Sequence, residues 1–395
     1  MTGMRVAIVH EWLSTLAGSE RVLEGLIQLY PTADLFVVVD FLPNADRDFL
    51  QGIQPKTTFI QKLPFAKSRF RQYLPLMPLA VEQWDLSRYD LIISSHHAVA
   101  HGVITGPDQC HISYVHSPMR YAWDLQHQYL RESALNRGLK GLIARYLLHR
   151  LRLWDVISAN RVDFFIANSD FIRRRIHRCY RRPATVIHPP VRVSAFNPHR
   201  PREAFYLTAS RLVPYKRIDL IVEAFSKTPH RRLIVIGDGP QRAQIQRLAG
   251  PNITLLGHQP DAILKDHLER TKAFVFAAEE DFGLLPVEAQ AAGAPVIAFG
   301  KGGVVETVIP LRAGIRPPAE APSPTGVFFE TQSVESLLQA VDFFEAEAHQ
   351  FHPSAIRAHA DPFDEPHFQA AMQAFIKQAL IRLQDRRPGD SSESP

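Results

Sequence analysis

Short apolar runs alternate with segments of helical periodicity along the whole chain, and the alternation starts a second time after residue 205. The runs of the first half are 5–10, 34–39, 91–94, 111–115, 163–167 and 184–187, and those of the second half are 205–209, 232–236, 253–255, 273–278, 295–299 and 326–329. Such runs predict buried strands. Strands that alternate with helices form parallel sheets covered by helices, so the sequence predicts an α/β fold with two sheets.

A proline-rich stretch separates the two halves. His188-Pro189-Pro190, Asn197-Pro198 and Arg200-Pro201 follow one another between the last strand of the first half and the first strand of the second. We therefore expect one domain over 1–190 and another over 200–360. The polar tail, 386–395, is expected to be disordered.

The composition excludes several classes of protein. No apolar run approaches the ~20 residues that a membrane-spanning helix needs. Cys110 and Cys179 are the only cysteines, which argues against a disulfide framework and favours a reducing compartment. The first residues lead directly into a strand and do not resemble a signal peptide. We therefore expect a cytoplasmic protein.

Positive charge is concentrated in the first half. Residues 1–190 contain 23 Lys and Arg against 16 Asp and Glu, whereas the remainder contains 22 against 24. Such a surface can meet nucleic acid, an anionic membrane or a phosphorylated substrate, or simply be solvated. The basic, aromatic segment 62–79 suits a membrane or acceptor surface as well as a solvated loop. For the helix predicted over 139–159, packing on the core is favoured over membrane contact.

The stretch from Phe276 to Ala289 carries the strongest chemical signal. An apolar run ends in an acidic turn with one glycine, and a helix starts near Pro286. Unpaired N–H groups at a helix start suit a phosphate, and the carboxylates of Glu280 and Glu288 suit hydroxyl groups. One phosphate site beside two hydroxyl sites describes a nucleotide sugar. An acidic loop that caps a helix is the alternative.

Other candidate residues also follow predicted strands. Arg211 and Lys216, in the loop after 205–209, can hold a diphosphate from two sides. His116 follows 111–115, at the strand end where open parallel sheets bind ligands. Asp46 and Asp48 have the Asp-x-Asp spacing of some metal sites, but they lie in a polar loop, and we expect no metal there.

With Ser210-Arg211 through Lys216, Gly237-Asp238-Gly239-Pro240, and Glu280 through Glu288 in this order, the chain resembles retaining glycosyltransferases of family 4. The resemblance covers most of the chain and is strongest over 205–306. It implies the GT-B fold, in which two Rossmann-like domains face each other across a cleft. It also implies that the last helix, 363–385, packs back on the first domain.

The resemblance assigns roles to individual residues. Arg211 and Lys216 neutralise the donor diphosphate, Glu280 faces the transferred sugar, and His116 lies near the reacting sugar. The remaining donor-binding positions are Gly18 at the diphosphate, Gly257 and His258 at the base, Asp281, Phe282 and Gly283 at the sugar, Leu284 and Leu285 at the phosphate, and Glu288 at the ribose. Ala17-Gly18 departs from the pair of glycines that many members have.

His10-Glu11-Trp12, together with the stretch from Tyr114 to Tyr121, looks like bacterial mannosyltransferases that build O-antigen or exopolysaccharide. This implies GDP-mannose as donor and a glycan or lipid-linked acceptor at the inner face of the membrane, with neither metal nor cofactor. A UDP-sugar donor remains an alternative. A GT-B epimerase acting on a nucleotide sugar and a basic nucleic-acid-binding protein are the rival functions.

Overall fold

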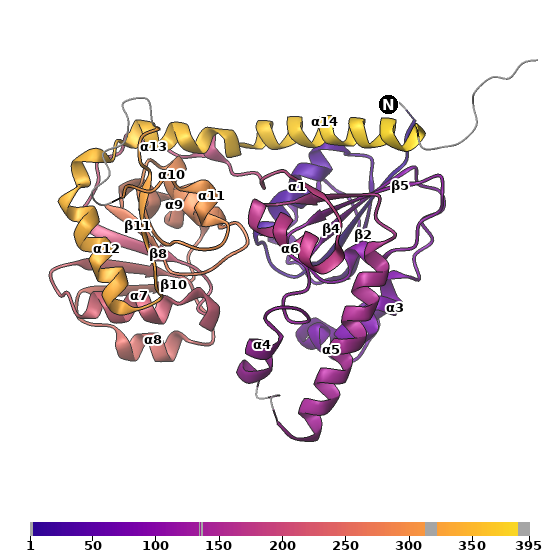
Figure 1. The fold of residues 1–395 in the computed structure, drawn as a ribbon, viewed down its shortest axis with the longest axis horizontal. Coiled ribbons are helices and arrows are strands. Elements are labelled where there is room, and N and C mark those ends of the chain that lie inside the picture. The colour runs from indigo at the N-terminus through magenta and orange to yellow at the C-terminus, as the bar shows by residue number, and fades with distance from the viewer. Residues whose placement is uncertain (1–2, 134, 136, 313–321, 386–395) are drawn as a thin grey trace, which may run out of the picture. The chain divides into compact units, whose positions relative to one another are not determined.

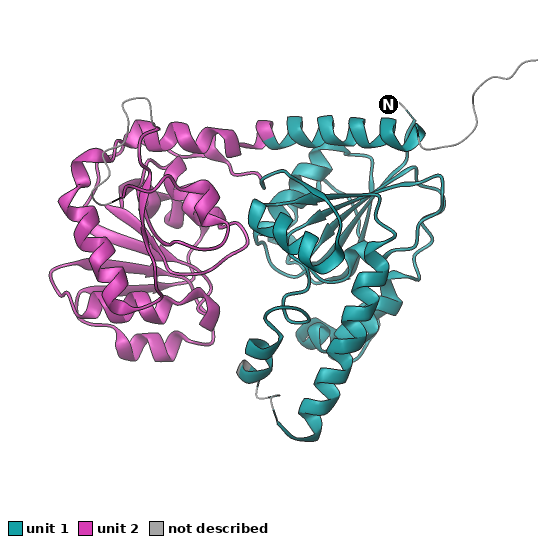
Figure 2. Cartoon of the chain, viewed as in Figure 1, with its two compact units in different colours: residues 1–189, 368–395 teal, residues 190–367 magenta. Residues whose placement is uncertain are grey.

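The computed structural model describes residues 3–385 apart from 134, 136 and 313–321, so the tail predicted at 386–395 lies outside the described residues. The chain divides into two compact units (Figure 1 and Figure 2). Unit 1 comprises residues 1–189 and 368–395, and unit 2 comprises residues 190–367. Each unit is built around one parallel sheet, which confirms the predicted fold class.

The strands of unit 1 are β1 (Val6–Leu13), β2 (Asp34–Asp40), β3 (Lys56–Thr57), β4 (Leu91–His96), β5 (Cys110–Val115), β6 (Phe164–Ala167) and β7 (Ala184–Val186). Within the described residues they form one parallel sheet in the order β3-β2-β1-β4-β5-β6-β7. β1 pairs with β4 in the register Ala7↔Ile92. β1 runs to Leu13, three residues beyond the predicted run, because it continues to pair with β2 up to Asp40.

The helices of unit 1 are α1 (Gly18–Leu29), α2 (Ala66–Arg69), α3 (Met77–Val81), α4 (Gln126–Glu132), α5 (Gly138–Ala159), α6 (Asp170–Tyr180) and, from Phe368 onward, α14 (Glu365–Gln384). One core cluster joins Leu23 of α1 to Met372 of α14 and to the sheet. A Cβ at Gly25 would lie 2.6 Å from the Phe368 ring, so this glycine lets α14 approach α1 closely. Packing of α14 in unit 1 is what the family's fold implies.

The strands of unit 2 are β8 (Phe205–Ala209), β9 (Arg232–Ile236), β10 (Ile253–Gly257), β11 (Ala273–Phe276), β12 (Val296–Phe299) and β13 (Gly326–Phe329). They form a parallel sheet in the order β10-β9-β8-β11-β12-β13 among the residues described. The helices are α7 (Ile218–Ser226), α8 (Arg242–Leu248), α9 (Asp261–Arg270), α10 (Leu284–Ala291), α11 (Val304–Thr307), α12 (Val334–Ala346) and α13 (Pro353–Ala360). Phe225 of α7 and Leu337 of α12 share one core cluster, whereas Leu268 of α9 and Ala289 of α10 share another.

In both sheets the strand order reverses at the first strand of the unit. In unit 1, β1 lies between β2 and β4, and in unit 2, β8 lies between β9 and β11. The chain therefore leaves the central strand in one direction and returns on its other side. Ligands of open α/β sheets bind beyond the carboxyl ends of the strands at this switch point. The loops after β1, β4, β8 and β11 are thus the places to look for a site.

Candidate active site

The loops after β8 and β11 bring two of the predicted residues together in unit 2. Lys216 lies in the loop after β8, and Glu280 lies in the loop after β11. Their sequence positions are 64 residues apart, but Lys216 Nζ donates a hydrogen bond to Glu280 Oε1. Both side chains are largely shielded from solvent. Arg211 lies in the same loop as Lys216 and is exposed.

Two glycines in the turn after β9 support the loop that carries Arg211. Gly237 has a φ of +134°, and a Cβ there would lie 1.8 Å from the Ser210 carbonyl oxygen. A Cβ at Gly239 would lie 2.5 Å from the carbonyl oxygen of Leu212. Leu212 N donates to the Asp238 carbonyl at 2.9 Å. The two backbones therefore lie in direct contact, which only glycine permits at these positions.

A second pair of glycines holds the acidic turn after β11. Gly303 N donates to the Glu280 carbonyl at 2.8 Å. A Cβ at Gly302, whose φ is +82°, would lie 2.4 Å from the same oxygen, and one at Gly303 would lie 2.4 Å from the Asp281 carbonyl oxygen. The sequence alone does not assign a role to these two glycines. Their role in the structure is to fix the backbone of Glu280.

The helix predicted near Pro286 is α10, and it begins at Leu284 after Gly283, whose φ is +87°. Pro286 lies in its first turn, and Leu284 and Leu285 contribute first-turn N–H groups that have no partner within an α-helix. Glu288 is half-buried in the following turn.

The remaining donor-binding candidates of unit 2 are Asp281, Phe282, Gly257 and His258. The ring of Phe282 packs in a core cluster with a centroid distance of 5.9 Å to Phe363, and Asp281 beside it is half-buried. Gly257 ends the edge strand β10, where its carbonyl accepts from Gly237 N at 2.7 Å. The neighbouring His258 is exposed. Because β9 separates β10 from β8, these two residues lie two strands from Lys216.

His116 lies in unit 1 at the end of a chain of hydrogen-bonded side chains. Its Nε2 is 2.9 Å from Ser95 Oγ, Ser95 Oγ is 3.0 Å from His10 Nδ1, and His10 Nε2 is 3.4 Å from Glu20 Oε1. These residues come from α1, β1, β4 and the loop after β5, and Glu20, His10 and Ser95 are buried. We call this set the Glu20–His116 chain. Sequence reasoning missed its three buried members, although polar residues inside the apolar strands β1 and β4 are a signal.

Glu20 connects the same chain to the start of α1. Its Oε2 accepts from Ala17 N at 2.9 Å and from Ser19 Oγ at 3.0 Å. A serine before a helical segment is a common N-cap, but Ser19 does not cap α1, because the helix begins at Gly18 after Ala17. Gly18, the predicted diphosphate contact of unit 1, is thus the first residue of α1, two positions before Glu20.

The protonation states in this region follow from burial. Burial, with the neighbouring His97 and His10, holds the pKa of His116 well below its ordinary value. Burial alone would raise the pKa of Glu20, but the contact with His10 lowers it below the ordinary value. The structure therefore favours an uncharged imidazole at His116 and an ionised carboxylate at Glu20 near neutral pH.

Glu11 is one of the residues on which the mannosyltransferase resemblance rests. In the structure, its carboxylate binds the backbone of the segment after β4. Its Oε1 accepts from the backbone N–H groups of Ala98 at 2.7 Å and Ala100 at 3.0 Å. Burial acts to raise its pKa, but His96, His97 and the backbone donors bring it far below the ordinary value. A fully buried carboxylate with these donors anchors the segment after β4.

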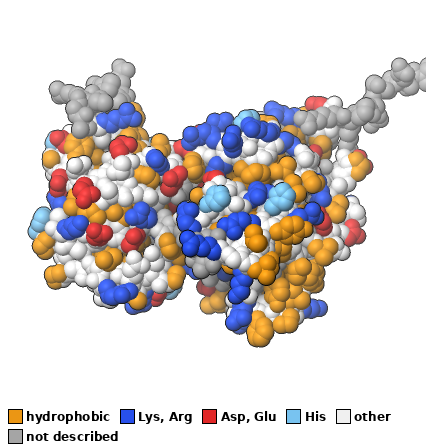
Figure 3. Space-filling model, turned by 60° about the horizontal axis from the view of Figure 1, so that its bottom comes forward, with side chains coloured by type: hydrophobic (Ala, Val, Ile, Leu, Met, Phe, Trp, Pro, Cys, Tyr) orange, Lys and Arg blue, Asp and Glu red, His pale blue; other side chains and the backbone are white. Residues whose placement is uncertain are grey.

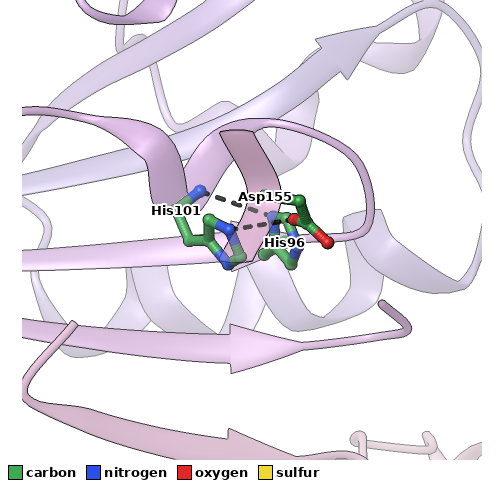
Figure 4. Close-up of side chains that lie close together, drawn as sticks. All are labelled: His96, His101 and Asp155. Atoms are coloured by element: carbon green, nitrogen blue, oxygen red, sulfur yellow. Dashed lines mark hydrogen bonds and ion pairs between the residues drawn. The ribbon is translucent and has the colours of Figure 1, made fainter. Parts of the chain in front are cut away.

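Among the described residues, His96, His101 and Asp155 form a buried group whose potential ligand atoms lie within 4.8 Å of one another. His101 Nε2 is 3.2 Å from Asp155 Oδ1, and the two imidazole rings stack with centroids 3.6 Å apart (Figure 4). Asp155 Oδ2 also accepts from Trp123 Nε1 at 2.7 Å and from Tyr180 Oη at 3.0 Å. Asp155 thus joins α5 to α6 and to the segment before α4. Asp46 and Asp48 lie apart from this group, in 3₁₀ turns.

Two family models match the chain: "Glycosyltransferase Family 4" over residues 16–195 and "Glycosyl transferases group 1" over residues 193–356. Together they cover most of both units, and the chain belongs to family 4 of the glycosyltransferases. This membership leaves the nucleic-acid-binding alternative without support.

Two curated relatives show how far the sequence similarity extends. A GDP-mannose-dependent monoacylated alpha-(1-6)-phosphatidylinositol monomannoside mannosyltransferase of Corynebacterium glutamicum is 29% identical over 197 residues, 40% of this chain and 52% of the relative. A D-inositol 3-phosphate glycosyltransferase of Mycobacterium marinum is 28% identical over 170 residues, 37% of this chain and 36% of the relative. The matches therefore span about half of these relatives or less.

Solved structures share the fold at low sequence identity. Anabaena Alr3699/HepE in complex with UDP has a TM-score of 0.67 at 17% identity, covering 95% of this chain and 100% of that chain. Sucrose-phosphate synthase from Thermosynechococcus elongatus has a TM-score of 0.69 at 17% identity, covering 96% and 100%. These likenesses identify the fold as GT-B. Within the described residues, no helix combines the length and the hydropathy that a membrane span requires.

Proposed function

We propose that this chain is a retaining, metal-independent glycosyltransferase that moves a sugar from a nucleoside diphosphate to a glycan or lipid-linked acceptor. The observation that carries the proposal is the contact of Lys216 with Glu280 at the switch point of unit 2. Lys216 offers a cation for a diphosphate, Glu280 offers a carboxylate for sugar hydroxyls, and the loops that carry them contact two pairs of glycines. The start of α10 adds N–H donors beside Glu280.

In this proposal, the bond between the sugar and the diphosphate breaks and negative charge builds up on the leaving diphosphate. Lys216, Arg211 and the first N–H groups of α10 stabilise that charge, which removes the need for a metal ion. The acceptor hydroxyl attacks the anomeric carbon from the face that the diphosphate leaves, and a phosphate oxygen of the donor takes the proton of this hydroxyl. Glu280 and Glu288 bind hydroxyl groups of the sugar and the ribose.

For the donor, we propose GDP-mannose, with a mannose-containing or lipid-linked glycan of the cell surface as acceptor. The Corynebacterium relative is a GDP-mannose-dependent mannosyltransferase, which supports this choice. A UDP-sugar is the second candidate, because the structural neighbour HepE was solved with UDP and with UDP-glucose. Transfer to a lipid-linked acceptor would take place at the inner face of the cytoplasmic membrane.

A transfer assay with a panel of GDP- and UDP-sugars and mannose-containing acceptors tests the proposal. We expect release of the nucleoside diphosphate that depends on an acceptor, a product that keeps the anomeric configuration by NMR, and full activity after treatment with EDTA. Conversion of the donor to an epimer without acceptor would instead support the epimerase alternative. Loss of activity with EDTA would contradict the metal-independent mechanism.

A further inference from the structure

Helix α5 presents an apolar face to solvent. The side chains of Leu139 and Tyr146 are 73% and 63% exposed. The exposed apolar residues on this face recur every three, four or seven positions: Leu139, Leu142, Ile143, Tyr146, Leu153 and Ile157. We call these six residues the α5 ridge. Residues with this spacing form one continuous stripe along a helix.

The α5 ridge is not the face by which α5 joins the fold. Leu151 and Asp155, on the other side of the helix, are buried, and Leu151 belongs to a core cluster of unit 1. The prediction that the apolar residues of this helix pack on the core is therefore correct for Leu151 and wrong for Leu142, Ile143 and Tyr146. An isolated exposed leucine needs no explanation, but a contiguous apolar stripe marks an interaction surface.

Basic side chains lie beside the α5 ridge and within it: Arg150 is on the same face, between Tyr146 and Leu153. Lys140 and Arg150 are exposed, and Arg145 and Arg152 are half-buried on the same helix. The single acidic residue of α5, Asp155, is buried, so the described surface of the helix carries positive charge only. Figure 3 shows hydrophobic side chains gathered on this part of the molecule with Lys and Arg beside them.

The segment 62–79 also exposes apolar side chains. Instead of a loop it forms short helices, with Phe70 and Met77 buried. Leu76 and Leu79 are exposed on η4 (Phe70–Leu76) and α3. The end of α3 lies beside α5, because Trp154 Nε1 of α5 donates to Glu82 Oε1 at 2.9 Å.

We propose that the α5 ridge, together with the basic side chains of α5, docks unit 1 on an anionic lipid bilayer. A bilayer surface offers an apolar layer to the exposed leucines and isoleucine and anionic headgroups to the lysine and arginines. A second copy of the chain fits less well. A two-fold contact through the same face would place these positive charges opposite one another. An electrostatic contact with nucleic acid would leave the apolar side chains unpaired.

Docking would matter for catalysis only if the acceptor is lipid-linked, so this inference rests on the proposed function. A lipid-linked acceptor is held at the surface of the membrane, and docking through α5 would bring unit 1 to the same surface. Nucleotide binding by unit 2 does not require the contact, so the two proposals can fail separately.

Co-sedimentation with vesicles tests the docking surface. The variant Ile143→Ser/Arg150→Ser removes one apolar and one basic side chain from α5. The matched control Ile381→Ser/Lys377→Ser makes the same kinds of change on α14, at exposed positions of the same unit. We expect wild type and control to bind vesicles containing phosphatidylglycerol, with binding weakened by salt and absent from phosphatidylcholine vesicles. The α5 variant should bind at least about tenfold more weakly.

Three outcomes would overturn the docking proposal. They are absence of vesicle binding by the wild type, equal binding by both variants, and a wild-type dimer that the α5 variant abolishes without any vesicle binding. Size-exclusion chromatography with light scattering detects the last of these. Circular dichroism confirms that both variants fold. A nucleoside diphosphate titration of the α5 variant separates the two proposals, because loss of vesicle binding with unchanged nucleotide affinity concerns docking alone.

Discussion

Lys216 meets a carboxylate that the proposed mechanism also needs. Its ammonium group pairs with Glu280, so a diphosphate that binds Lys216 must share or replace this contact. An ammonium group that neutralises a phosphate typically contributes on the order of 1.5–3 kcal/mol. The ion pair with Glu280 therefore compensates the charge of Lys216 while no nucleotide sugar is bound.

Replacing Lys216 with alanine should weaken the binding of a nucleoside diphosphate by roughly tenfold or more, because a charge-assisted hydrogen bond is lost. Isothermal titration calorimetry measures the change. Lys227→Ala is the control, since Lys227 forms only an exposed ion pair with Glu223. Equal affinities in the two variants would exclude Lys216 from the diphosphate site.

The Glu20–His116 chain predicts a separate effect on turnover. Ser95→Ala removes the hydrogen bond that orients the His116 ring, and we expect kcat to fall by roughly tenfold while donor affinity stays unchanged. Ser94→Ala is the matched control, because Ser94 Oγ makes a similar bond of 3.0 Å to His111 Nε2. Each variant should lose about 1 kcal/mol of stability. Equal kcat values for Ser95→Ala and Ser94→Ala would show that the Glu20–His116 chain does not orient His116.

The candidate residues differ in how far the sequence could predict them. Arg211, Lys216 and Glu280 follow predicted strands in recognisable motifs, so their place at strand ends can be read from the chain. His10 and Ser95 could not be assigned in this way. Their contact depends on β1 lying beside β4, a pairing between positions 85 residues apart. A single histidine or serine in an apolar strand does not reveal such a pairing.

At the scale of elements, close backbone contacts explain why glycines follow β9 and β12. Gly237 and Gly302 lie against the loops that carry Arg211 and Glu280, and both have positive φ. The sequence predicted most strands and helices within a few residues, because their apolar periodicity is strong. It could not predict the start of α1, where the side chain of Glu20 accepts a hydrogen bond from the N–H of Ala17, the residue before the helix.

Gly237→Ala should destabilise unit 2 by about 2–4 kcal/mol, because its Cβ would collide with the Ser210 carbonyl and its φ is unfavourable. Chemical denaturation followed by far-UV circular dichroism measures the loss. Gly52→Ala is the control: its φ is also positive, but nothing lies within 4 Å of the added Cβ. We expect a cost of only about 1 kcal/mol there. Similar losses of stability in Gly237→Ala and Gly52→Ala would contradict the close contact between Gly237 and Ser210.

At the scale of the whole molecule, buried histidines make unit 1 sensitive to acid. Unit 1 buries several uncharged histidines: burial, with His101 nearby, lowers the pKa of His96 to about 4 and that of His111 to about 3. The unfolded chain has ordinary histidines with pKa values near 6.5 and binds more protons below that pH. Acid therefore favours unfolding of unit 1.

We expect the free energy of unfolding of unit 1 to fall between pH 7 and pH 5, with His96 and His111 each contributing about 2 kcal/mol at pH 5. Tryptophan fluorescence during urea unfolding reports on unit 1, because Trp12, Trp84, Trp123 and Trp154 all lie there. His111→Gln should reduce the pH dependence by the contribution of one residue. A transition that is independent of pH would contradict the assignment of uncharged histidines.

The central claim is that unit 2 binds the nucleoside diphosphate of a sugar donor. Calorimetric titration of the wild type and of Arg211→Ala/Lys216→Ala with GDP, UDP, ADP and TDP tests it most directly. We predict that the wild type binds one of these nucleotides at one site per chain and that the double variant loses this binding while it remains folded. Absence of binding by the wild type to every nucleotide, or unchanged affinity in the double variant, would contradict the account.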